Sequence, residues 1–157
     1  MTLPTDLREF FESLISNDVD FLIVGAYALA YHGLPRLTSD VDVLVGMDLK
    51  NAGRVVKALQ DFGFGSLGIQ SEDFAHEDRV LVLGVEPNKV DLFTTVLGVD
   101  FGEAWRDRVR GELGGLEVWY LSREHLIRAK RAAGRPKDIA DLAMLLGEDA
   151  DGGAPKG

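Results

Sequence analysis

The 157-residue chain contains no cysteine, which excludes disulfide bonds, thiolate metal sites and cysteine nucleophiles. Histidine is scarce too: His32, His76 and His125 are far apart in the sequence, which argues against a histidine-based zinc site. No apolar stretch approaches the roughly 18 residues of a membrane span, so no membrane partner is expected. The acidic, polar N-terminus lacks a basic region leading into an apolar run. We therefore expect no secretory signal and predict a cytoplasmic protein.

Basic residues are also outnumbered by acidic ones, 17 to 26. The formal net charge of −9 argues against non-specific coating of nucleic acid, which depends on many Lys and Arg contacts to phosphates. The exception is the segment 123–137, in which six bases accompany a single acid, Glu124. This basic stripe either receives a phosphate-bearing ligand or is the solvated face of a helix. The sequence leaves both interpretations open.

The pattern of apolar residues predicts one α/β (α+β) domain over 1–147 and a disordered tail, rich in glycine and acids, over 148–157. About four to five strands are expected, at 20–25, 39–45, 79–85, 89–95 and 116–121. A turn at 86–88 would join the third and fourth of them into a hairpin. Helices are expected at 5–16, 26–32, 49–62, 101–110, 123–133 and 136–146. Asp48 and Ser122 are the predicted caps of two of these helices.

Two aspartates open a predicted strand that is otherwise apolar, although aspartate is depleted in strands. At spacing i, i+2, the side chains of Asp40 and Asp42 leave the same face, roughly 6.5–7 Å apart at the backbone. Two unpaired carboxylates at that distance repel each other. Mg²⁺ relieves the repulsion because it prefers hard oxygen ligands. The alternative is that one aspartate caps a turn and the other is solvated at an edge strand.

The surroundings of the aspartate pair favour a ligand site. Gly25 lies between an apolar strand and a helix, where the backbone can approach a ligand and free N–H groups can meet a phosphate. The chain from Gly25 to Asp40 is long enough for one helix and a return strand, so the glycine and the carboxylates are expected at the same end of adjacent strands. Asp91 lies in another apolar strand and would complete a triad able to hold two metal ions if the strands are neighbours. Alternatively, Asp91 occupies an exposed edge position.

Two blocks of sequence carry a resemblance to a known family. Gly25-Ala26 followed by Gly33-x-x-Arg36-x-Thr38-x-Asp40-Val-Asp42 resembles the signature of the nucleotidyltransferase superfamily, which has the DNA polymerase β-like fold. The run from Lys130 to Leu142 resembles the second signature of bacterial abortive-infection toxin (AbiEii-like) nucleotidyltransferases. The resemblance covers most of 19–147. It implies a small mixed sheet flanked by helices.

The resemblance also implies an enzyme, a metal-dependent nucleotidyltransferase of EC 2.7.7 type that uses a nucleoside triphosphate (NTP). Its Mg²⁺ or Mn²⁺ would be bound by Asp40, Asp42 and Asp91, and Asp91 is also a candidate base for the acceptor hydroxyl. The nucleotide would be bound by Gly25, Ala26, Arg36, Ser39, Lys130 and Asp138. Two of these have alternatives: Arg36 could pair with a nearby acid, and Ser39 could only shape the turn into its strand.

The acceptor is left open by the sequence. The toxin branch implies RNA, in particular tRNA ends, and an antitoxin partner. The rival is an antibiotic-type small-molecule adenylyltransferase, because only one modest basic stripe is available to grip RNA. A non-catalytic nucleotide- or partner-binding module of the same fold is the third hypothesis. It is favoured by Ala26, which stands where the superfamily usually has Gly or Ser, whereas the intact aspartates and Lys130 argue against it.

Overall fold

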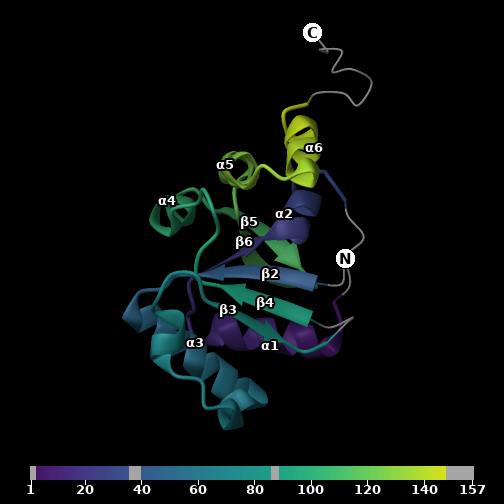
Figure 1. Cartoon of the computed structure of the whole chain (residues 1–157). Helices are drawn as coiled ribbons and strands as arrows, with labels where there is room; N and C mark the ends of the chain where they lie inside the picture. The colour runs from purple at the N-terminus through teal and green to yellow at the C-terminus, as the bar shows by residue number, and fades with distance from the viewer. Residues whose placement is uncertain (1–2, 36–39, 86–88, 148–157) are drawn as a thin grey trace.

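The computed structural model describes residues 3–35, 40–85 and 89–147, so the predicted tail 148–157 lies outside the described residues. A six-stranded mixed sheet with the order β3-β4-β2-β1-β6-β5 runs through the molecule (Figure 1). Its strands are β1 (Phe21–Val24), β2 (Asp40–Val45), β3 (Val80–Leu83), β4 (Lys89–Phe93), β5 (Val109–Leu113) and β6 (Leu116–Tyr120). The predicted α/β (α+β) class is confirmed, and the predicted number of strands is one too low.

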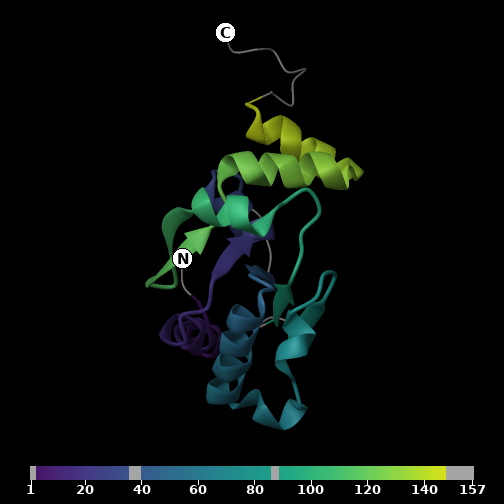
Figure 2. The same ribbon diagram turned by 90° about the vertical axis from the view of Figure 1, so that its left-hand side faces the viewer.

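Helices cover both faces of the sheet. In Figure 2, α1 (Thr5–Ser16) and α3 (Leu49–Leu59), in purple and blue, lie on one side of it. The pair α5 (Arg123–Ala133) and α6 (Pro136–Leu145), in green and yellow, lies on the other. The remaining helical segments are α2 (Gly25–Tyr31), α4 (Phe101–Arg106) and three short turns at Gln60–Phe64, Gly65–Leu67 and Ser71–Phe74. In the described ranges, no helix combines the length and apolarity needed to cross a membrane.

The position of β1 at the centre of the sheet explains why its sequence is entirely apolar. All four of its residues are at most 4% exposed, because β2 and β6 flank it and helices cover both faces. The predicted caps are also present. Asp48 accepts a hydrogen bond from the backbone N–H of Asn51 (2.9 Å), and Ser122 accepts one from that of His125 (3.2 Å). Local sequence therefore determined where α3 and α5 begin.

The predicted helix 101–110 is wrong in its second half. The helix α4 ends at Arg106, and the chain then forms β5, which pairs antiparallel with β6. Gly114 and Gly115 join the two strands with φ of 58° and 84°, the left-handed backbone that two-residue hairpins require. The Gly-Gly pair was the available signal for a hairpin. The polar segment β5 forms a strand because its backbone pairs with the edge of β6.

Candidate functional site

The site begins where β1, β2 and β4 run side by side. The strand β2 pairs antiparallel with β1, which sets Val24 opposite Asp42, and parallel with β4, which sets Asp42 opposite Asp91. Gly25 directly follows Val24 and therefore comes next to Asp42. The tertiary structure thus brings together three residues that are far apart in the sequence.

Gly25 is required at this position for two independent reasons. Its φ of +65° lies in the left-handed region that residues with a side chain avoid. A Cβ added to it would lie 2.2 Å from Oδ2 of Asp42, much closer than any van der Waals contact. The absent side chain therefore leaves the space that the Asp42 carboxyl group fills.

The carboxyl groups of Asp42 and Asp91 form a strained electrostatic pair. The register of β2 and β4 sets them directly opposite each other, on the same face of the sheet. Burial, reinforced by the charges of Asp91 and Asp40, raises the pKa of Asp42 to about 6. Oδ1 of Asp91 is buried and has no hydrogen-bond partner within the described residues. Two clustered carboxyl groups with an unsatisfied oxygen are a donor set that fits a divalent cation.

We expect Gly25→Ala to disrupt this pair. The new methyl group would overlap Oδ2 of Asp42, and the left-handed backbone adds roughly 1–2 kcal/mol of strain. Gly68→Ala is the matched control, because Gly68 has φ +69° and an added Cβ there would meet nothing within 4 Å. Thermal unfolding should show a larger loss of stability for Gly25→Ala than for Gly68→Ala. Equal losses would mean that Asp42 accommodates the methyl group.

Asp40, the third predicted carboxylate, does not join the pair directly. Its Oδ2 lies 3.2 Å from Nζ of Lys89, which is also 3.6 Å from Oδ2 of Asp91. Within the described part of the chain, no three His, Asp or Glu side chains are arranged to hold a metal ion together. Sequence reasoning missed Lys89. The spacing could have identified it, because a residue two positions before Asp91 has its side chain on the same face of the predicted strand.

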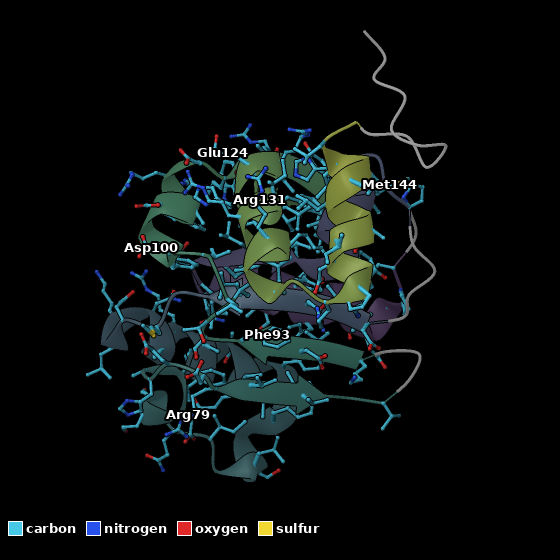
Figure 3. All side chains as sticks on the ribbon, turned by 45° about the horizontal axis from the view of Figure 1, so that its top comes forward. Arg79, Phe93, Asp100, Glu124, Arg131 and Met144 are labelled. Carbon is cyan, nitrogen blue, oxygen red and sulfur yellow. The ribbon has the colours of Figure 1, made fainter. Side chains whose placement is uncertain are left out.

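A cleft of about 320 Å³ lies beside this pair, between the sheet and the helices α5 and α6. Four predicted residues line it: Gly25, Asp42, Lys130 and Asp138. Phe93, another lining residue, is labelled in Figure 3 at the end of β4. Apolar side chains from the sheet, the segment after β4 and α5 make up most of the wall, including Val96, Leu97, Leu126 and Ala129. A mostly apolar wall with a few convergent polar groups is typical of small-molecule sites.

Lys130 anchors the helical side of the cleft. Its Nζ lies 3.3 Å from Oδ1 of Asp138 and 3.0 Å from Oδ2 of Asp141, two side chains that are nearly completely buried. Burial lowers the pKa of Lys130, and the hydrogen bond and the charge of Asp138 oppose this shift. Hydrogen bonds from Arg135, together with Lys130, lower the pKa of Asp138 to about 2. One cation therefore holds α5 and α6 together at the edge of the cleft.

This pairing goes with an orientation of α6 that matches only half of the predicted apolar face. The sequence predicts that Ile139, Leu142, Leu145 and Leu146 form one apolar face. In the structure Leu142 and Leu145 face the core as predicted, beside the buried Asp138 and Asp141. Ile139 and Leu146 are instead 59% and 40% exposed. Met144, which Figure 3 labels on α6, is exposed as well. Sequence reasoning missed the role of Asp141, for which the available signal was its spacing of three from Asp138 on the same helical face.

The other predicted nucleotide-binding residues are Ala26, Arg36 and Ser39. Ala26 follows Gly25 in α2 but does not line the cleft. Arg36 and Ser39 lie outside the described residues. The roles of all three remain predictions.

The basic stripe predicted over 123–137 is largely paired within the protein. Arg128 contacts Glu124 at 2.8 Å and Glu103 at 3.4 Å, and Arg123 donates to the backbone oxygen of Leu145. Lys130 and Arg135 contact buried aspartates, as described above. Within the described residues, this leaves Arg131 and Lys137 as the bases of the stripe without an ion pair or a side-chain hydrogen bond.

Comparison with known proteins gives a consistent result. Residues 5–146 match the model of a family described as nucleotidyltransferase of unknown function (DUF6036). No curated protein gives a significant match. A candidate nucleotidyltransferase (TM1012) from Thermotoga maritima superimposes with a TM-score of 0.61, at 18% identity, over 95% of this chain and 97% of that one. An antigenic nucleotidyltransferase-like protein from Paracoccidioides brasiliensis gives 0.51, at 18% identity, over 93% and 78%. At such identities the likeness shows the fold.

Proposed function

Because this chain belongs to the DUF6036 family of nucleotidyltransferases, we propose that it transfers a nucleoside monophosphate from an NTP to an acceptor hydroxyl. The observation that carries the proposal is one arrangement of side chains. Two clustered carboxyl groups, Asp42 and Asp91, lie beside Gly25, and Asp42 and Lys130 line the same cleft. This arrangement suits a metal-bound triphosphate.

The carboxylates would hold the divalent cation. Asp42 and Asp91 would bind Mg²⁺ or Mn²⁺, and Asp40 would join them once it is released from Lys89. When bound, the ion neutralises charge on the phosphates and on the oxygens that attack and leave. The raised pKa of Asp42 supports this assignment, because a cation would stabilise the ionised form that burial now opposes.

The nucleotide would lie in the cleft with its phosphates toward the sheet. Glycine at position 25 allows the phosphates to approach the backbone. The ammonium of Lys130 has three N–H donors, and its contacts with Asp138 and Asp141 leave capacity for a phosphate oxygen. The apolar wall that includes Phe93 and Leu126 would cover the base and sugar.

The reaction would be an in-line displacement. The acceptor oxygen attacks the α-phosphorus, the bond from this phosphorus to the oxygen that bridges to the β-phosphate breaks, and pyrophosphate leaves with the electron pair. Asp91 would accept the proton of the acceptor hydroxyl. As in phosphoryl transfers generally, the protein would act mainly by positioning groups and by neutralising charge.

Two acceptor classes have support. The AbiEii-like resemblance favours RNA, with tRNA ends as the first candidate and an antitoxin as partner. The internal pairing of the basic stripe favours a small molecule, because few of its bases are available to bind a phosphate backbone. We therefore include both acceptor classes in the test.

The experiment uses purified protein, each α-labelled NTP, Mg²⁺ or Mn²⁺, and either total bacterial RNA or an aminoglycoside. We expect label to move to one acceptor class, and the same NTP to raise the unfolding temperature only when the divalent ion is present. If no label moves and no NTP stabilises the protein, the proposal is wrong. The chain would then be a partner-binding module with the same fold, the alternative that Ala26 favours.

A further inference from the structure

A lysine shares the face of the sheet on which the three carboxylates lie. The register of β2 and β4 sets Asp40 opposite Lys89 and Asp42 opposite Asp91. Since residues two apart on a strand point the same way, the four side chains form a two-by-two array. Nζ of Lys89 lies 3.2 Å from Oδ2 of Asp40 and 3.6 Å from Oδ2 of Asp91. The ammonium thus bridges two of the three carboxylates.

We propose that Lys89 is a built-in counter-cation that takes the place of one of two divalent ions until nucleotide binds. The inference rests on the proposed function, because it concerns the metal site of that function. Without nucleotide, one ion binds at Asp42 and Asp91 while Lys89 holds Asp40. Lys89 releases Asp40 when the second ion arrives together with the triphosphate.

The charges of the array support this sequence of events. Three ionised carboxylates and one ammonium leave an excess of two negative charges, which one divalent cation neutralises. A second divalent ion would give the array an excess of two positive charges, which departure of Lys89 reduces to one and a polyanion neutralises. A triphosphate is such a polyanion. Electrostatics therefore ties the second ion to the nucleotide.

The positions of the carboxyl groups and of Lys89 indicate where in the array the first divalent ion binds. Asp42 and Asp91 lie directly opposite each other, and Oδ1 of Asp91 has no hydrogen-bond partner within the described residues. Lys89 is on the other side of Asp91, toward Asp40, with 27% of its side chain exposed. A partly exposed lysine on a flexible stem can leave Asp40 without disturbing the core. The first ion therefore binds on the Asp42 side, and the place of the second is the one that the ammonium fills.

The test is the binding of Mn²⁺ to nucleotide-free protein, measured by electron paramagnetic resonance of free Mn²⁺ and by calorimetry. We expect the wild type to bind one ion. Lys89→Met and Lys89→Gln should bind two, the first at least tenfold more tightly, because a positive charge a few ångströms away has gone. Lys89→Arg keeps the charge and should behave as the wild type. With a non-hydrolysable NTP analogue, the wild type should take up its second ion.

The outcomes separate this inference from the function on which it rests. If Lys89→Met and Lys89→Gln match the wild type in affinity and in number of ions, Lys89 does not compete with metal, although the metal site stands. If none of these proteins binds Mn²⁺, both the inference and the metal-dependent function fail. Circular dichroism of each variant identifies a folding defect, and having two neutral variants ensures that one defect does not decide the result.

Discussion

Asp42→Asn should abolish nucleotidyl transfer and at the same time stabilise the metal-free protein. We expect activity to fall by at least about three orders of magnitude, because a neutral amide is a poor ligand for Mg²⁺ and charge stabilisation at the reacting phosphate is lost. The gain in stability has a separate cause. The amide introduced by the substitution could donate a hydrogen bond to Asp91, and one of two clustered charges would be removed.

The stability effect depends on pH with a definite sign. The pKa of Asp42 is about 6 in the folded protein and 3.8 in the unfolded chain. Between these values the folded protein holds more protons, so stability falls as the pH rises from about 4 to 6 and stays low above that. A shift of this size corresponds to about 3 kcal/mol, which solvent screening reduces to roughly 1–2 kcal/mol. Asp42→Asn should therefore stabilise at pH 8 and have little effect at pH 4.

Chemical denaturation at both pH values measures this directly, and Asp40→Asn is the contrasting variant. Asp40 is paired with Lys89 at 3.2 Å, so its loss should reduce activity without stabilising the fold. If Asp42→Asn is less stable than the wild type at pH 8 without metal, Asp42 and Asp91 do not oppose folding. If it still transfers label, Asp42 is not a metal ligand of the reaction.

Lys130→Met should be the most destabilising of the changes considered. The ammonium lies 3.3 Å from Asp138 and 3.0 Å from Asp141, and its removal leaves the Asp141 carboxylate buried without that cation. Breaking a buried ion pair from one side costs about 3–5 kcal/mol. Asp138 is affected less, because Arg135 donates to it at 2.6 Å. We expect the unfolding temperature to drop sharply.

A second substitution separates this structural effect from nucleotide binding. Lys130→Met with Asp141→Asn removes both charges and should recover most of the lost stability. The double variant should still lose stabilisation by NTP, because the Lys130 ammonium that would bind the triphosphate has been removed. Lys137→Met is the matched control: it is an exposed base near the start of α6 with no ion pair among the described residues, and its removal should alter neither property. Normal NTP binding by the double variant would restrict Lys130 to a structural role.

The sequence predicted much of the candidate site through local rules. A buried strand that ends in glycine, a short helix and an aspartate pair at spacing i, i+2 are all visible within 20–42. The caps at Asp48 and Ser122 depend on side chains acting within one turn, so they too could be predicted. The strand β5 could not be identified by composition, because its stability comes from pairing with β6.

The amino-acid sequence by itself thus determined which residues carry charge in apolar surroundings and where most helices and strands begin. Only the tertiary structure decided which charges meet. The register of β2 and β4 paired Asp42 with Asp91 and Asp40 with Lys89. The docking of α6 on α5 turned Asp138 and Asp141 inward to Lys130, beside Leu142 and Leu145, and left Ile139 exposed. Periodicity describes one element at a time, whereas strand register and helix docking minimise the free energy of the whole chain, including the burial of its charges.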